Sequence, residues 1–311
     1  MTERFSDRLV KACKDKKSHL ALALRPDVKK IPDFIKKGCK SLGAALYMYN
    51  KGFIDAVCDI IPAIVMPIAD YEAYGISGFV AFDATVKYAR TKGLIVIADG
   101  KRGGTKEECE AYARAYLSAD AAGVAEDGGT LVEGTFSVDA LTVSPYSSCE
   151  GIRNMIRLCD ENFRGLFISA MNTASDKEDE FENIVCKEEE EPLYKSALAD
   201  GSFFGKNYIG ESGYSIVGLF VKSAEDAYEV RDMDTWGIIL VDADDDEYFV
   251  TERYSEYFNS DDGQGALICV SKRVMHAFEG SDYSDEYNEE TYAEAAREET
   301  IKLSKKLTSV I

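Results

Sequence analysis

The chain has 311 residues, 46% of them hydrophobic, which fits one large α/β domain or two smaller ones. Its net charge of −20 argues against nucleic acid and against an anionic membrane surface as partners, because both would repel it. The polar N-terminal segment lacks the apolar stretch of a signal peptide, and no run of ~18 apolar residues occurs, so we expect a cytoplasmic protein.

Short apolar runs alternate with helical patterns along the chain. After an N-terminal helix, eight runs have the length and composition of buried strands, at 19–24, 63–67, 94–99, 140–143, 165–170, 216–221, 237–241 and 266–270. Helices are predicted at 32–49, 51–58, 75–92, 106–119, 151–160, 224–231 and 290–307. Continuously apolar strands separated by helices are typical of a parallel sheet that is covered on both faces.

A closed (β/α)8 TIM barrel is the predicted fold, as a single domain over residues 1–311. The alternative is a doubly wound open sheet, which would place a glycine-rich dinucleotide loop after the first strand. The first strand and the residues after it read HLALALRPD, without a glycine, and this favours the barrel.

Two insertions interrupt the alternating pattern. The first, at about 120–139, carries a Gly-Gly turn between two β-like pieces and is predicted to form a hairpin. The second, at about 172–213, contains the acidic run KEEEE at 187–191, which is typical of a solvated loop or helix start.

The cysteines and histidines do not predict a metal centre. Eight cysteines are scattered without a CxxC pair, and His19 and His276 are the only histidines. A zinc site of the usual spacing is therefore not expected, the thiols are expected to be free, and no metal or cofactor is predicted. No serine stands in a G-x-S-x-G elbow beside either histidine.

Asp99 and Lys101 stand at the end of the third predicted strand, two residues apart. Side chains with this spacing point to the same face of a strand, and the carboxyl ends of barrel strands carry the active site. The pair could therefore be an acid and its orienting partner. The other interpretation is an internal salt bridge at a strand end.

The segment DADDDE at 242–247 follows the seventh strand. It lacks the spacing of the D-x-D-x-D-G calcium loop, although three or four clustered oxygens would suit Mg²⁺ or Ca²⁺. An exposed acidic loop at the barrel rim and a divalent metal site both remain open interpretations.

The segment IADGKRGGTKEECEAYARAYL at 97–117 resembles the signature of the orotidine 5′-phosphate decarboxylase family, D-x-K-x-x-D followed by a small-residue turn and a helix. Further stretches match in order and resemble the longer bacterial branch: MPIADYEAYG at 66–75, LTVSPY at 141–146, GESGYSIVGLFV at 210–221 and GALICVSKRVMHAF at 265–278. The resemblance implies a TIM barrel of pyrimidine biosynthesis that converts orotidine 5′-phosphate to uridine 5′-monophosphate and CO2. It also implies a homodimer whose sites are completed across the interface.

The sequence departs from the catalytic pattern that the resemblance implies. Asp99 and Lys101 match the first two charged positions, but the third carboxylate falls on Gly104. A second lysine, expected at the end of the second strand, falls on Met66, and a threonine that serves the partner subunit's site falls on Glu108. Each lost preorganised charge costs about 10² to 10³ in rate.

The ligand-binding positions are also altered. Arg25 stands where the resemblance implies an aspartate that binds ribose hydroxyls. Met171 stands where the resemblance implies a serine, and the neighbouring Asn172 is retained. The acidic residues 242–247 replace a Gly- and Gln-containing phosphate loop, and Lys272, with Arg273 adjacent, stands where a phosphate-binding arginine is implied.

Three functions are compatible with these features. The first is a diverged family member, or pseudoenzyme, in which decarboxylation is weak or absent. The second is a working decarboxylase in which Lys101 donates the proton and Asp99 orients it. The third is a barrel protein that binds a cationic or metal-linked ligand, since the four aspartates within 242–247 favour positive charge. Arg25, Asn172, Lys272 and Arg273 are the candidate ligand-binding residues.

Overall fold

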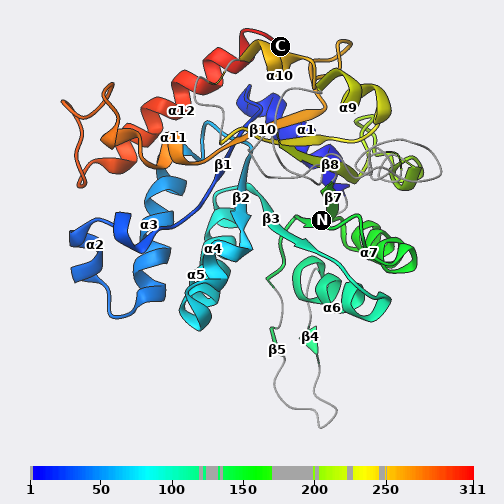
Figure 1. Cartoon of the computed structure of the whole chain (residues 1–311), viewed down its shortest axis with the longest axis horizontal. Coiled ribbons are helices and arrows are strands. Elements are labelled where there is room, and N and C mark those ends of the chain that lie inside the picture. The colour runs from blue at the N-terminus through cyan, green and yellow to red at the C-terminus, as the bar shows by residue number, and fades with distance from the viewer. Residues whose placement is uncertain are drawn as a thin grey trace, which may run out of the picture.

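Eight parallel strands close into a barrel, and their order around it follows their order along the chain (Figure 1). The strands are β1 (Leu20–Ala23), β2 (Ala63–Pro67), β3 (Ile95–Arg102), β6 (Ala140–Val143), β7 (Gly165–Ser169), β8 (Val217–Lys222), β9 (Ile239–Asp242) and β10 (Ala266–Val270). β1 pairs with β2 on one side and with β10 on the other, which closes the sheet. The predicted (β/α)8 TIM barrel is therefore confirmed.

The computed structural model describes residues 3–118, 122–123, 132–133, 136–169, 199, 203–222, 227–244, 249 and 251–311. The acidic run at 187–191 and residues 245–247 of the acidic segment DADDDE lie outside these described residues, as does Asn172.

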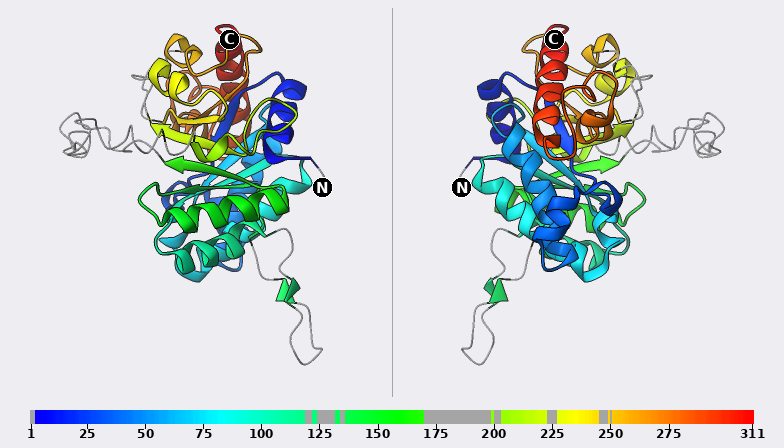
Figure 2. Two further views of the ribbon diagram at one scale, coloured as in Figure 1. Left: turned by 90° about the vertical axis from the view of Figure 1, so that its right-hand side faces the viewer. Right: turned by 90° about the vertical axis from the view of Figure 1, so that its left-hand side faces the viewer.

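Helices surround the barrel strands (Figure 1). They are α1 (Phe5–Lys16), α2 (Asp33–Gly38), α3 (Leu42–Val57), α4 (Ile68–Glu72), α5 (Gly75–Thr91), α6 (Lys106–Leu117), α7 (Cys149–Asn162), α9 (Ala227–Met233), α10 (Thr251–Ser255), α11 (Lys272–Met275) and α12 (Tyr292–Thr308), with 3-10 turns at Val28–Lys30 and Ala277–Glu279. α6 and α7 lie side by side on the outside of the barrel (Figure 2). In the described part of the chain, every helix is too short or too polar to span a bilayer.

The barrel core consists of continuously buried strands. All residues of β1, β2, β6 and β10 are buried. Side chains of such strands meet the barrel interior on one face and the helices on the other, which is why the sequence runs are apolar without alternation.

One helix boundary was predicted wrongly. The sequence suggested helices at 32–49 and 51–58, whereas the break lies earlier, between α2 and α3. Ser41 caps α3, its hydroxyl accepting a hydrogen bond from the backbone N–H of Ala44. Gly52 does not interrupt α3 but leaves room for Tyr292 of α12, since a Cβ at this position would lie 1.9 Å from the tyrosine oxygen.

The first insertion contains a pair of short strands, β4 (Ala122–Gly123) and β5 (Val132–Glu133), which pair antiparallel. This is the strand pairing of the hairpin predicted within 120–139. The second insertion is described only at residue 199 and from residue 203 onward.

β3 extends to Arg102, beyond its predicted end at Asp99. Its register against β6 shifts between Ala98 and Arg102, and Lys101 has a φ of 45°, in the left-handed region. A bulge of this kind redirects side chains at a barrel rim. It gives the end of β3 its particular arrangement of charged groups.

Candidate active site

A cavity of about 370 Å³ opens at the carboxyl ends of the barrel strands, where enzymes with this fold place their active sites. Its charged lining comes from the strand ends and the residues that follow them: Arg25, Asp70, Glu72, Asp99, Lys101, Arg102, Lys222, Asp242, Asp244 and Lys272. Of the candidate residues from the sequence, Asp99, Lys101, Arg25 and Lys272 thus lie together, while Arg273 does not line the cavity.

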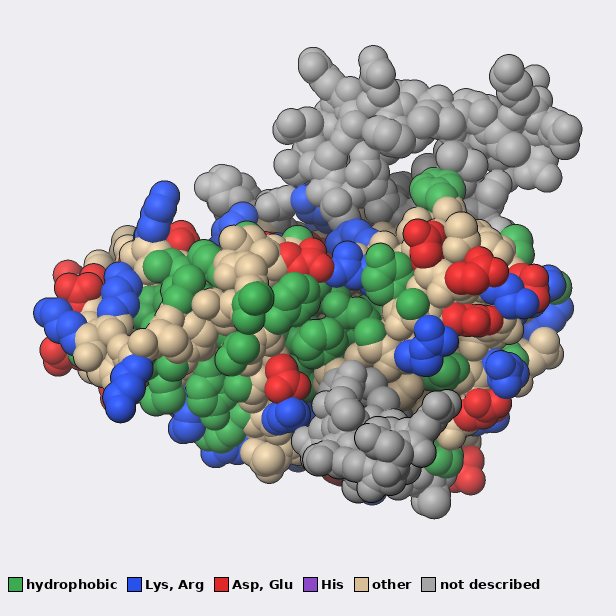
Figure 3. Space-filling view, turned by 90° about the horizontal axis from the view of Figure 1, so that it is seen from below, with side chains coloured by type: hydrophobic (Ala, Val, Ile, Leu, Met, Phe, Trp, Pro, Cys, Tyr) green, Lys and Arg blue, Asp and Glu red, His purple; other side chains and the backbone are tan. Residues whose placement is uncertain are grey.

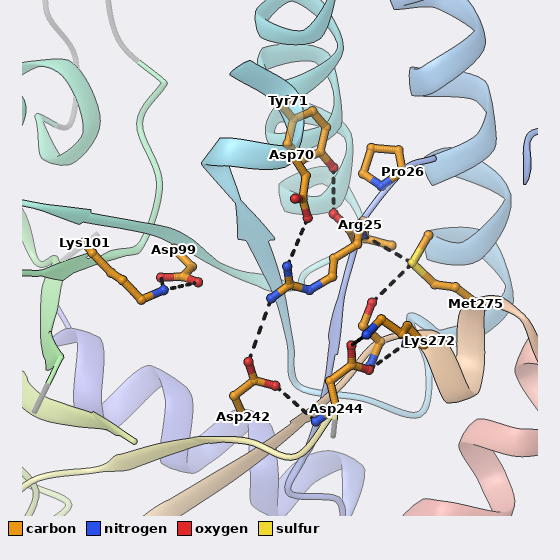
Figure 4. Close-up of polar contacts among 12 residues, drawn as sticks. Arg25, Pro26, Asp70, Tyr71, Asp99, Lys101, Asp242, Asp244, Lys272 and Met275 are labelled. Carbon is orange, nitrogen blue, oxygen red and sulfur yellow. Dashed lines mark hydrogen bonds and ion pairs between the residues drawn. The ribbon is translucent and has the colours of Figure 1, made fainter. Parts of the chain in front are cut away.

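The ammonium of Lys101 lies 2.9 Å from each carboxylate oxygen of Asp99 (Figure 4). The Asp99 side chain is 5% exposed and the Lys101 side chain 38% exposed, so the pair bridges the barrel interior and the cavity. The ammonium also lies 4.8 Å from the centre of the Phe220 ring. This geometry is suited to a proton donor that a buried carboxylate holds in place.

Thr142 of β6 fixes this pair from behind. Its buried hydroxyl donates to Asp99 at 2.7 Å and accepts from the backbone N–H groups of Gly100 and Lys101, both at 2.9 Å. It therefore holds the β3 bulge and the carboxylate at once. The sequence analysis missed this residue, although a threonine within the apolar strand ALTV was a visible signal.

The turn after β3 is a helix cap. Thr105 and Glu108 form a capping box at the start of α6, in which the Glu108 carboxylate accepts from the backbone N–H of Thr105 at 2.8 Å. Gly104 has a φ of 126°, and a Cβ there would lie 2.2 Å from the Glu108 carboxylate. At position 104 the family resemblance implies a carboxylate. The backbone conformation there favours glycine, and the Glu108 side chain fills the space that a side chain at position 104 would need. The motif T-x-x-E at 105–108 would have predicted this cap.

Arg25, two residues after β1, lies between two carboxylates from opposite sides of the cavity (Figure 4). Its guanidinium is 3.1 Å from Asp70, which follows β2, and 3.8 Å from Asp242, at the end of β9. Burial lowers the pKa of Arg25, but these carboxylates more than offset it, so its net pKa is raised. Burial also raises the pKa of Asp242, against the backbone N–H of Asp244 and the charge of Arg25.

Asp244 occupies the start of α11. Its Oδ1 accepts hydrogen bonds from the backbone N–H groups of Ser271 at 2.9 Å and Lys272 at 2.7 Å (Figure 4). The Asp244 side chain is 7% exposed, whereas that of Lys272 is 67% exposed and its ammonium lies 3.8 Å from Asp244. The acidic segment thus has a buried, hydrogen-bonded beginning, which differs from the exposed loop that was one of its interpretations.

The charges around the cavity balance. Five basic side chains and five carboxylates of the described residues line it. The ion pairs Arg25–Asp70 and Arg102–Glu72 join neighbouring elements, and Lys101–Asp99 lies within β3. The described residues of its lining therefore carry no net formal charge.

Comparison with known proteins identifies the relatives of this chain. It is 28% identical over 295 residues to the orotidine 5′-phosphate decarboxylase of Caldicellulosiruptor saccharolyticus, an alignment that covers 90% of this chain and 92% of the relative. The chain is a homologue of the orotidine 5′-phosphate decarboxylases. No family model matches it.

Two solved structures superpose on this chain over nearly its whole length and have the same barrel fold. A protein from Streptomyces avermitilis superposes with a TM-score of 0.76 at 22% identity, covering 99% of this chain and 96% of that one. The orotidine 5′-phosphate decarboxylase of Leishmania donovani superposes with a TM-score of 0.69 at 18% identity, covering 99% and 98% of the two chains.

Proposed function

We propose that this chain is a diverged orotidine 5′-phosphate decarboxylase homologue in which conversion of orotidine 5′-phosphate to uridine 5′-monophosphate is weak or absent. The observation that carries this proposal is the position of Asp244, whose carboxylate is bound to the first backbone N–H groups of α11.

TIM barrels commonly bind phosphate with the loops after their last two strands and the start of a short helix. Here these elements are β9, β10 and α11, and Asp244 already takes the two N–H groups at that place. Each pair of like charges about 4 Å apart costs about 4 kcal/mol near a protein surface. A phosphate dianion would therefore have to displace Asp244, and the exposed Lys272 offers limited compensation because water screens it.

The catalytic array is reduced as well. Met66, at the position of the expected second lysine, is fully buried in the core. Gly104, at the position of the expected third carboxylate, belongs to the turn that Glu108 caps. Of the charged groups that the family resemblance implies, the Asp99–Lys101 pair remains.

The second candidate is a working decarboxylase. The observation in its favour is the bidentate contact of Lys101 with Asp99 inside a cavity at the correct end of the barrel. Lys222, at the end of β8, adds a further cation to that cavity.

An assay of orotidine 5′-phosphate turnover separates these two functions. We expect product formation by the native chain to equal that of a Lys101→Met variant, which lacks the only proposed proton donor. Turnover that is lost in the Lys101→Met variant would instead establish the working enzyme. Uridine 5′-monophosphate is expected to leave the melting temperature unchanged, because a ligand raises it only by binding the native state.

A cationic or metal-linked ligand gains less support. The described carboxylates of the acidic segment, Asp242 and Asp244, already contact Arg25 and the start of α11. Among the described residues, no three histidine, cysteine or acidic side chains are grouped to hold a metal ion.

We further propose that the protein is a homodimer, as the resemblance implies. Hydrophobic side chains gather on the face that Figure 3 presents, over the side of the barrel formed by α2, α3 and α5. Exposed members on these helices are Phe34, Leu42, Met48, Ile76 and Val80. Contiguous apolar surface of this kind is typical of an interaction site. Sedimentation equilibrium tests the proposal: Ile76→Glu should shift the chain toward monomer, and Tyr228→Glu, an exposed aromatic on α9, should not.

A further inference from the structure

A second cavity, of about 610 Å³, lies at the opposite end of the barrel from the candidate active site. It borders the start of β3, at Leu94 and Ile95, and Asp139, which immediately precedes β6. Arg8 from α1 and Arg90 from the end of α5 form part of its wall. Its volume falls in the range of small-molecule sites, about 300–1,000 Å³.

Three arginines surround this end of β6. Arg8 and Arg164 both donate to the same oxygen of Asp139, at 2.8 and 3.2 Å. Arg164 and Arg90 both donate to the hydroxyl of Ser137, at 2.9 and 3.1 Å. Ser137 has a φ of 46°, in the left-handed region, so the backbone itself is bent to present these acceptors.

The arginine cluster carries more positive charge than its carboxylate neutralises. Asp139 is shared by Arg8 and Arg164, and no acidic side chain within the described ranges lies at ion-pair distance from Arg90. Burial lowers the pKa of Arg164, Asp139 raises it, and repulsion from Arg90 and Arg8 lowers it again. Among the described residues that line the cavity at the other end of the barrel, basic and acidic side chains are equal in number.

Unused donors accompany this excess charge. The Nε atoms of Arg8 and Arg164 are buried, and neither has a hydrogen-bond partner in the described part of the structure. Buried guanidinium donors are normally satisfied, by protein, water or ligand. The remaining charged residues of the cavity wall are Lys11, Lys87, Glu3 and Asp15, all more exposed than Asp139.

We propose that this cavity is a second binding site, for a small polyanion that carries two or more phosphate or carboxylate groups. Arg90 is its principal contact, with Arg8 beside it at the cavity wall. Arginine is suited to this role because its planar fork binds oxyanions with paired hydrogen bonds. In a chain of net charge −20, a local excess of guanidinium groups is the feature that would select an anion.

Calorimetric titration of the full chain with sodium pyrophosphate and, separately, with sodium citrate tests the proposal, with total ionic strength held constant by sodium chloride. We expect saturable binding of at least one probe, with affinity reduced at least about tenfold in Arg90→Gln, equivalent to ~1.4 kcal/mol. Arg90→Lys keeps the charge without the fork and should give an intermediate affinity. Arg157→Gln, an exposed arginine on α7, is the matched control for the change in net charge and should bind as the native chain does.

Two further measurements locate the site and identify the ligand chemistry. Lys101→Met alters the cavity at the other end of the barrel, so binding that persists in this variant and falls in Arg90→Gln places the anion at the arginine cluster. Preference for pyrophosphate or for citrate assigns the site to phosphates or to carboxylates. The proposal is overturned if neither probe saturates, if folded Arg90→Gln binds as tightly as the native chain, or if Lys101→Met abolishes binding.

Discussion

The hydroxyl of Thr142 lies 2.7 Å from a carboxylate oxygen of Asp99 and donates a hydrogen bond to it. The same hydroxyl accepts from two consecutive backbone N–H groups of β3, so one buried oxygen joins the acid, the bulge and the neighbouring strand. The retained acid–base pair therefore depends on a strand that comes about forty residues later in the chain.

The Thr142 hydroxyl is expected to contribute substantially to stability. Thr142→Val keeps the shape but leaves two backbone donors unpaired and removes one hydrogen bond from the Asp99 carboxylate, which should lower the free energy of unfolding by about 3 kcal/mol. Thr142→Ser keeps the hydroxyl and should lose less than Thr142→Val. Urea denaturation measures both, and a Thr142→Val protein as stable as Thr142→Ser would contradict this role.

Removal of the Asp244 carboxylate is expected to free the start of α11 for a phosphate. Asp244→Ala should bind uridine 5′-monophosphate at least about tenfold more tightly than the native chain, because it removes both the repulsion and the competing acceptor. Asp244→Asn removes the charge but keeps an acceptor oxygen, and should gain less. Thermal shift against nucleotide concentration gives the comparison. An Asp244→Ala variant that gains no affinity would show that the carboxylate does not block the site.

Restoring a carboxylate at position 104 should not restore a site. Gly104→Asp places a side chain at a φ of 126° and forces the Glu108 carboxylate out of its capping bond, so we expect a loss of about 2–4 kcal/mol. Adding Glu108→Thr removes the collision but keeps the backbone strain, so the double variant should be less stable than Glu108→Thr alone. Calorimetric melting of the three variants completes the cycle. Equal stability of the double variant and Glu108→Thr would contradict the strain at this position.

Asp55 is expected to make stability depend on pH in the acid range. Burial raises the pKa of Asp55, but hydrogen bonds from Lys51, Lys92 and Tyr88 more than offset this effect and lower the pKa to about 2. Since the folded pKa lies below the ordinary value near 3.9, the contribution is present above that value and is lost as the pH falls toward 2. The native chain should therefore exceed Asp55→Asn in stability at pH 6, and this difference should shrink steadily below about pH 4. A difference that persists unchanged at pH 2 would rule out this contribution.

The sequence predicted the barrel because its strands are buried on both faces, which makes each one a plain apolar run such as AIVMP at 63–67. It misplaced a helix boundary at Asn50, whereas α3 continues through this position and through Gly52, which admits Tyr292 from the far end of the chain. A packing partner so distant in sequence leaves no local signal.

The candidate site was predicted only in part, because several of its contacts also join residues that are far apart in the sequence. The spacing of Asp99 and Lys101 indicated that their side chains would meet, and they do, although across a bulge that the two-residue repeat does not contain. The partners of Arg25 and Asp244 come from other strands, and these contacts exist only once the barrel closes. Asn172 lies outside the described residues, so its predicted role stays a prediction.

The described side chains that line the candidate active-site cavity include equal numbers of basic and acidic groups, and this has a kinetic consequence. Because the described residues of its lining carry no net formal charge, they add little steering of their own, and an approaching anion meets chiefly the long-range field of a molecule with a charge of −20. Dissolved salt screens that field over about 8 Å at physiological ionic strength. Anionic molecules should therefore reach this barrel faster as salt is added, whereas association steered by opposite charges becomes slower.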